Sequence, residues 1–289
     1  MKKITDIGHF SVSVEIVPPR NGRDPSTLFE QLGNIKDKID FISVTKGAGG
    51  SLRGGSFPIS HIANSSYGLN VVPHLVCRER NRYELENEIV DLHYFGMKNI
   101  LALRGDPPAG SDQHWSGEYH YAYRLAEQVR NMNHGIYLPL QNDDSPRTGL
   151  RTDFCIIVAG HPEDQIKDEI RHLRCKINAG ASLVITQMVF SFEEFRSYFE
   201  GLRSEGIDIP VIAGIRPLVN LNQARATETF FGLKVNERLK QGLGGDSARD
   251  FGVGYTIDMI RRLKECGAFG AHLFVLSDLE LAGQILSGL

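Results

Sequence analysis

The stretch DFCIIVAGHPEDQIKDEIRHLRCKINAGASLVITQMVF, residues 153–190, contains two apolar runs separated by a segment with helical periodicity. The runs, 153–160 and 182–190, are nearly continuous in valine, isoleucine and other apolar residues. This pattern is typical of strands that are buried on both faces, as in parallel sheets. The segment between them ends in Gly180, and glycine is favoured just after a helix C-terminus. The stretch therefore predicts a strand, a helix and a second strand parallel to the first.

The same alternation recurs along the whole chain. Further β-type runs, each associated with a helical stretch, cover residues 10–17, 40–45, 70–76, 99–104, 210–215 and 270–276. Eight strand–helix units in 289 residues match a (β/α)8 TIM barrel. A doubly wound sheet is the main alternative, but no G-x-G-x-x-G follows the first run, and GAGGSLRGG (47–55) lacks that spacing. The sequence therefore predicts an α/β barrel with a single domain, residues 1–289, in which the polar segment 131–153 forms a surface excursion.

Composition limits the classes of function. The formal net charge is −3, and no basic stripe of the kind found in nucleic-acid binders is present. No apolar run approaches the roughly 18 residues that span a bilayer, and the N-terminus has no secretory signal pattern. We therefore expect a cytoplasmic protein that binds neither nucleic acid nor membrane. The four cysteines form no C-x-x-C pair and the strand ends show no H-x-x-x-H spacing, so we expect no metal site.

In a (β/α)8 barrel the active site is built at the C-terminal ends of the strands. The polar residues expected there are Glu15, Thr45, Lys46, His74, Arg104, Asp106, His161, Thr186, Gln187, Arg216, Gln223, Ser277 and Asp278, with the small residues Ala48, Gly105 and Ala159 among them. Amides and carboxylates can bind the edge of a ring, and small residues allow the ring to approach closely. The set therefore predicts a site for a flat polar ligand such as a flavin or a pterin.

Seven segments resemble a known family when they are taken together. They are SVEIVPPR, DFISVTKGAGGSLR, PHLVCRER, NILALRGDPP, AGHPE, KINAGASLVITQMVF and VIAGIRPLVNLNQ. In this order they resemble the methylenetetrahydrofolate reductase family, flavin-dependent (β/α)8 enzymes of one-carbon metabolism, over nearly the whole chain. The resemblance implies an oxidoreductase that converts 5,10-methylenetetrahydrofolate to 5-methyltetrahydrofolate by hydride transfer from a reduced flavin. The flavin would be FAD, with FMN as the alternative, and NAD(P)H would be the reductant.

The resemblance also implies roles for individual residues. Glu15 matches the acid that protonates the departing nitrogen as the folate ring opens, and burial beside apolar residues can raise its pKa as this role requires. Asp106 matches a second catalytic residue, beside the flavin and the pterin. Gln187 and Gln223, with Asp106, match folate contacts, because amides both donate and accept hydrogen bonds. The flavin contacts match Thr45, Lys46, Ala48, His74, Arg104, Gly105, Asp106, Tyr121, Ala122, Ala159, His161, Glu169 (adenosine ribose) and Lys176 (phosphate).

Four positions depart from the family pattern. Lys46 and His161 stand where tyrosines are common, Thr227 where some members have a phenylalanine, and Asp278 where some have an arginine that contacts folate. These changes leave three alternatives open: electrons from a partner iron–sulfur subunit in place of NAD(P)H, a tetrahydromethanopterin-type carrier in place of folate, and a flavin- or pterin-binding accessory protein without turnover. Association into a homo-oligomer through the outer helices also remains open.

Overall fold

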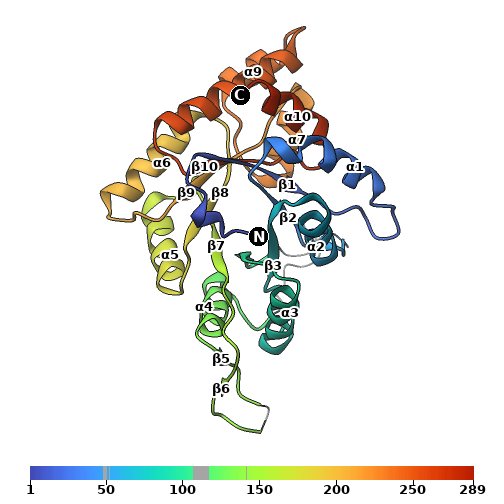
Figure 1. Ribbon diagram of the computed structural model, residues 1–289. Helices are drawn as coiled ribbons and strands as arrows, with labels where there is room; N and C mark the ends of the chain where they lie inside the picture. The colour runs from blue at the N-terminus through green and yellow to red at the C-terminus, as the bar shows by residue number, and fades with distance from the viewer. Residues whose placement is uncertain (48–50, 52, 107–116, 141) are drawn as a thin grey trace.

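Eight parallel strands close into a barrel in the computed structural model, which describes residues 1–47, 51, 53–106, 117–140 and 142–289 (Figure 1). The strands follow the order β1-β10-β9-β8-β7-β4-β3-β2 around the barrel. Their bounds are β1 (Ser11–Ile16), β2 (Phe41–Val44), β3 (Asn70–Val76), β4 (Asn99–Leu103), β7 (Cys155–Gly160), β8 (Leu183–Val189), β9 (Val211–Ile215) and β10 (Gly270–Leu273). Each lies within one of the apolar runs, so the predicted (β/α)8 barrel is confirmed.

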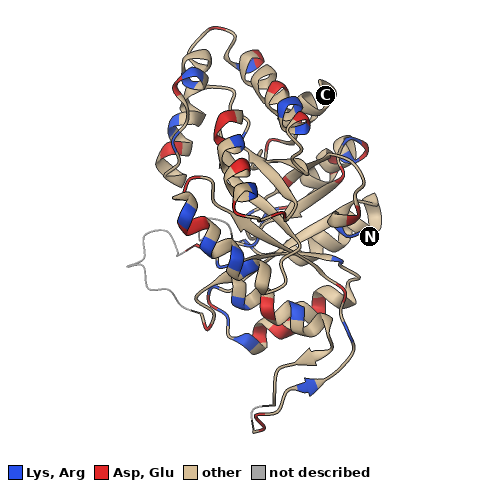
Figure 2. Cartoon of the chain, turned by 90° about the vertical axis from the view of Figure 1, so that its left-hand side faces the viewer, with Lys and Arg blue, Asp and Glu red and all other residues tan. Residues whose placement is uncertain are grey.

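Helices surround the barrel. They are α1 (Ser26–Ile35), α2 (Ser56–Tyr67), α3 (Arg82–Tyr94), α4 (Ala122–Asn133), α5 (Ile166–Asn178), α6 (Phe192–Ser204), α7 (Leu221–Phe231), α8 (Glu237–Leu243), α9 (Ala248–Glu265) and α10 (Leu279–Ser287), with short 3-10 turns η1 (Ile4–Asp6) and η2 (Lys36–Lys38). Local sequence fixes several helix starts, because the side chains of Asn81 and Ser191 accept hydrogen bonds from the first turns of α3 and α6. Charges of both signs are interspersed on the described outer helices (Figure 2).

The N-terminal turn closes one end of the barrel (Figure 1). Ile4 is fully buried and belongs to the same apolar cluster as Phe41, Leu101 and Ile157 from the strands. The backbone N–H of Ile4 donates to Oδ1 of the buried Asn99 at 2.8 Å. This bond ties the N-terminal turn to the first residue of β4. It therefore holds the turn against the end of the barrel that lies opposite to the C-terminal ends of the strands.

Segment 131–153 starts as the last turn of α4 and continues into a β-hairpin, β5 (Ile136–Tyr137) and β6 (Arg147–Thr148), that projects from the barrel (Figure 1). Buried Glu86 of α3 anchors the hairpin: its carboxylate accepts from the Leu138 N–H at 2.7 Å and from the Arg147 guanidinium. The expected excursion thus contains a helix end and a paired hairpin in addition to loop.

Gly105, in the loop that follows β4, adopts a left-handed backbone conformation with φ +88°. A Cβ at this position would overlap Cγ1 of Val76 and lie 3.2 Å from Cβ of Arg78. Both the backbone angle and the close packing therefore require glycine.

We expect Gly105→Ala to lower the free energy of unfolding by about 2 to 4 kcal/mol, because the methyl group adds overlap to backbone strain. Gly96→Ala is the matched control, since Gly96 also has a positive φ, +72°, but has open space around its Cα. The control should lose only about 1 kcal/mol. Denaturant unfolding of the three chains measures the difference, and equal losses in both variants would contradict the packing argument.

Candidate functional site

Glu15 lies inside the barrel near the C-terminal end of β1, and 8% of its surface is exposed. Its Oε2 is 3.8 Å from Nε2 of His74 on β3. Burial raises the pKa of Glu15 from 4.5 to about 8, while the positive charge of Arg216 opposes part of this rise. Glu15 is therefore mostly protonated at neutral pH, as a general acid must be.

Two neutral histidines form a polar layer around Glu15. His272 of β10 is held between two strands, with Nδ1 2.8 Å from Oγ of Ser13 and Nε2 3.0 Å from Oγ of Ser43. Burial lowers the pKa of His74 to about 3, and burial together with the neighbouring His74 lowers the pKa of His272 to about 3. Neither imidazole therefore brings a positive charge to Glu15 near neutral pH.

Arg216 follows β9 directly and is held by α7. Its Nε donates to Oγ1 of Thr227 at 2.7 Å, and that hydroxyl donates to the backbone oxygen of Gln223 at 2.8 Å. Thr227 is completely buried. The threonine that departs from the family pattern is therefore a support for this arginine.

The loop after β4 places Arg104, Gly105 and Asp106 beside the end of β3. The guanidinium of Arg78 donates to the backbone oxygen of Asp106, and the Arg78 N–H donates to the backbone oxygen of Arg104 at 3.1 Å. These contacts fix the backbone of the loop, while the side chain of Asp106 stays exposed. The geometry is compatible with an aspartate that meets a ligand at the mouth of the barrel.

Lys46 points toward α3. Its Nζ lies 2.5 Å from Oε1 of Glu88 and 4.7 Å from the centroid of the Phe57 ring. Burial lowers the pKa of this lysine, and Glu88 offsets part of the shift. Its ammonium is therefore used in an ion pair. Ala48, the next expected cofactor contact, lies outside the described residues.

Four of the expected cofactor contacts, Ala159, His161, Glu169 and Lys176, form one cluster between β7 and α5. Glu169 is fully buried, and its Oε1 accepts from the His161 N–H at 2.9 Å and from the Tyr198 hydroxyl at 3.1 Å. Lys176 donates to the backbone oxygen of Ala159 at 2.8 Å. Burial lowers the pKa of Lys176, and the charge of Glu169 opposes this shift. The four predicted residues are therefore close neighbours.

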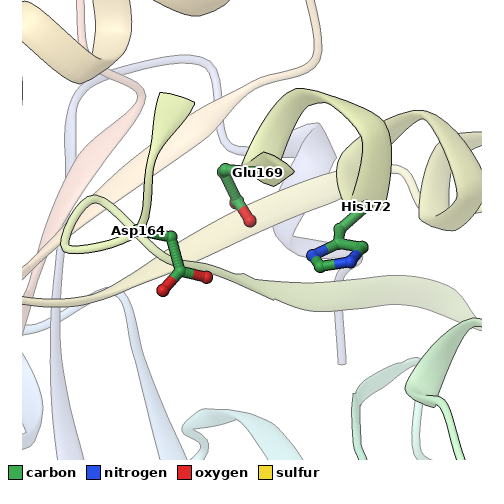
Figure 3. Close-up of side chains that lie close together, drawn as sticks. All are labelled: Asp164, Glu169 and His172. Carbon is green, nitrogen blue, oxygen red and sulfur yellow. The ribbon is translucent and has the colours of Figure 1, made fainter. Parts of the chain in front are cut away.

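The same cluster contains a set of side chains with metal-ligand chemistry. Single ligand atoms of Asp164, Glu169 and His172 lie within 4.8 Å of one another (Figure 3). Glu169 and His172 are three residues apart on α5, a spacing that places both on one helix face. Lys176 already brings a positive charge close enough for both carboxylates to raise its pKa, so we do not assign a metal ion to this set.

The two expected folate glutamines bind nearby backbone through their amide oxygens. Oε1 of Gln187 accepts from the Met188 N–H at 3.0 Å, at a register irregularity of β8. Oε1 of Gln223 accepts from the Val219 N–H at 2.9 Å, in the first turn of α7. Each side chain is thus oriented by its own segment.

Tyr121 and Ala122 lie at the start of α4. The Tyr121 ring is 57% exposed and stacks on Tyr123 with centroids 5.5 Å apart. Together with Tyr137 it lines a cavity of about 530 Å³ beside α4 and the hairpin. The Tyr121 side chain is therefore separate from the barrel interior that holds Glu15.

The sequence did not indicate His272 as a site residue, and it placed Arg216 at a strand end without indicating its support. His272 was overlooked because it lies within the last apolar run, where a single polar residue facing inward was the available signal. Arg216 was noted as a strand-end residue, but its link to Thr227 spans 11 positions and has no sequence signature. Asp278, noted as a departure, caps α10 by accepting from the Leu281 N–H at 2.9 Å.

A flavin suits the residues that are present. Three expected cofactor residues carry buried polar atoms with no hydrogen-bond partner among the described residues: Thr45 Oγ1, His74 Nε2 and Glu169 Oε2. Buried polar atoms are normally paired, so these three atoms are available to form hydrogen bonds with a bound ligand. The polar edges of a flavin and the hydroxyls of its ribose match them in chemical character.

The fold and the site define a barrel protein with a buried, protonated acid among neutral polar groups. The chain belongs to the methylenetetrahydrofolate reductase family, whose sequence profile matches residues 1–289. Among relatives, methylenetetrahydrofolate reductase 1 of Schizosaccharomyces pombe is 28% identical over 287 residues, which cover 95% of this chain and 45% of that protein. The chain thus spans about half the length of that relative. The 5,10-methylenetetrahydrofolate reductase of Escherichia coli is 28% identical over 289 residues, covering 96% and 90%.

A solved structure shares the fold. It is a Clostridium thermocellum protein described as binding two copies of 5-methyl-5,6,7,8-tetrahydrofolic acid, with a TM-score of 0.60 at 13% identity over 99% of this chain and 98% of that one. Among the described helices of the present chain, none combines the length and the apolar character that crossing a membrane requires.

Proposed function

We propose that this chain is a flavin-dependent reductase that converts 5,10-methylenetetrahydrofolate to 5-methyltetrahydrofolate. The observation that carries the proposal is Glu15, a buried carboxyl whose pKa is raised to about 8, at the ligand-binding end of a barrel of this family. Opening the folate ring requires a proton on the departing nitrogen, and a protonated carboxyl can donate it. The bound flavin would supply the hydride.

The other expected residues would bind and orient the two ligands. Thr45, His74 and Glu169 would bind the flavin through their unpartnered atoms, and Lys176 would face a phosphate of FAD. The exposed carboxylate of Asp106 would accept N–H bonds from the pterin edge. Gln187 and Gln223 would donate from their amide nitrogens, because their amide oxygens are held by backbone.

The purified chain tests the flavin assignment. We expect a yellow protein with the absorption spectrum of oxidised flavin, and release of FAD, or alternatively FMN, identified by mass. Turnover is then measured with 5,10-methylenetetrahydrofolate under anaerobic conditions. A colourless chain that takes up neither FAD nor FMN in a binding titration would contradict the proposal.

Two electron donors are compatible with the site. NAD(P)H is the donor implied by the family resemblance. A partner iron–sulfur subunit is favoured by Thr227, since a buried threonine bonded to Arg216 stands where an aromatic ring would stack on nicotinamide. Rapid anaerobic bleaching of the flavin by NADH or NADPH would support the first donor, and its absence with both would support the second.

A further inference from the structure

We propose that Arg216 is a positioning residue for the acid step: its guanidinium, held by Thr227, acts on Glu15 across the mouth of the barrel. The inference rests on the proposed function, because it concerns how Glu15 works as an acid. It concerns a pair of residues that are 201 positions apart in the chain.

The barrel register places the two side chains at the same level. Val14 pairs with Leu273, and Leu273 pairs with Ile215. The next residues along these strands are Glu15, Phe274 and Arg216, and in parallel neighbours residues in register point to the same face. Glu15 and Arg216 are thus two strands apart, a span of about 10 Å between backbones that a long arginine side chain can bridge.

Packing around Phe274 supports this placement. Its ring meets the ring of His272 edge to face, with centroids 5.1 Å apart. Since His272 faces the interior of the barrel, the Phe274 ring lies on the same inner side as Glu15. A Cβ on Gly214 would lie 2.5 Å from Cε2 of Phe274. Gly214 therefore leaves the room that this ring occupies against the inner side of β9.

One face of α7 holds the arginine in place. Gln223, Thr227 and Phe231 are spaced four residues apart and lie on the same helix face. Thr227 accepts from Arg216 Nε at 2.7 Å, and the Phe231 ring lies 5.7 Å from the guanidinium carbon. These two contacts fix the position of the guanidinium group relative to α7.

Arg216 supplies the positive charge that reaches Glu15. Among the described strand residues, His74 on β3 lies 3.8 Å from this carboxyl and His272 on β10 neighbours His74. Both are neutral at physiological pH because burial lowers the pKa of each to about 3. Arg216 and Glu15 each shift the pKa of the other toward its charged form. When Glu15 gives its proton to the departing nitrogen, the guanidinium stabilises the carboxylate that remains.

The test compares Arg216→Gln with wild type as flavin-loaded full chains. Without the guanidinium the pKa of Glu15 should rise by about 1 unit or more. The maximal rate should then fall, because the acid is weaker, and the pH at which the rate declines on the alkaline side should rise by the same amount. A second readout is independent of turnover. Carbon-13 NMR of protein with labelled glutamate monitors the titration of the Glu15 carboxyl, and the Glu15 signal is assigned as the one that is lost in Glu15→Gln.

Three further variants sharpen the comparison. Arg216→Lys keeps the charge and should restore most of the wild-type pH profile, and Thr227→Val should give an intermediate shift because the guanidinium loses its support. Arg225→Gln, an exposed arginine on the same helix, removes an equal charge and should change nothing. If Arg216→Gln does not fold, Thr227→Val and Arg216→Lys carry the test.

The outcomes separate the two proposals. An unchanged carboxyl titration and an unchanged pH profile in Arg216→Gln would overturn the role of Arg216. Full activity in Glu15→Gln would overturn the acid role of Glu15 and thus the proposed function, whereas the carboxyl titration in wild type and Arg216→Gln would still report whether the two residues interact.

Discussion

Glu15→Gln should lower the rate of 5,10-methylenetetrahydrofolate reduction by about 10²- to 10⁴-fold, the usual contribution of a positioned general acid. Glutamine preserves the size and much of the hydrogen bonding of the side chain, but it has no acidic proton. The departing nitrogen would then have to leave without protonation. Single-turnover measurements with prereduced protein isolate this step from reduction of the flavin.

Flavin content and a second glutamate separate catalysis from folding. Glu15→Gln should bind as much flavin as wild type, because the expected contacts Thr45 and His74 are unchanged. Glu194→Gln is the matched control: burial raises the pKa of Glu194 as well, but this residue lies on α6 and accepts from the Phe190 N–H at 3.0 Å. Wild-type turnover in Glu15→Gln would contradict the acid role, and equal losses in both variants would indicate a general effect of removing a carboxyl.

Residues within strands were the most predictable part of this molecule. Alternation of apolar runs and helical segments predicted all eight barrel strands, and a residue at the C-terminal half of such a strand has its direction fixed by the pleat. Glu15 and His74 could therefore be placed in one interior before the structure was known, and they lie 3.8 Å apart.

Residues in the loops after the strands were less predictable, because loop side chains choose among partners that are distant in sequence. Lys46 pairs with Glu88 of α3, and Tyr121 joins the cavity beside α4. The spacing of residues within a motif does not tell in which direction either of these side chains points. The same holds for Thr227, where the sequence indicated the loss of an aromatic ring but not the gain of a bond to Arg216.

The acid should also reduce the stability of the fold at high pH. Glu15 has a pKa of about 8 in the folded chain and an ordinary value of 4.5. Between these two values the unfolded chain releases the proton that the folded chain keeps, so wild type loses stability as the pH rises from 4.5 to 8, and the full loss persists above 8. Glutamine does not titrate and is free of this loss.

We therefore compare the free energies of unfolding of Glu15→Gln and wild type. We expect the difference, variant minus wild type, to be larger at pH 8 than at pH 5 by about 3 kcal/mol. Denaturant unfolding of both flavin-free chains at the two pH values measures this. The lowered pKa values of His74 and His272 affect both chains alike and largely cancel in the difference. A difference that stays constant with pH would contradict a buried, protonated Glu15. A variant that is more stable and almost inactive is the result expected when burial of a carboxyl serves proton transfer at the expense of folding.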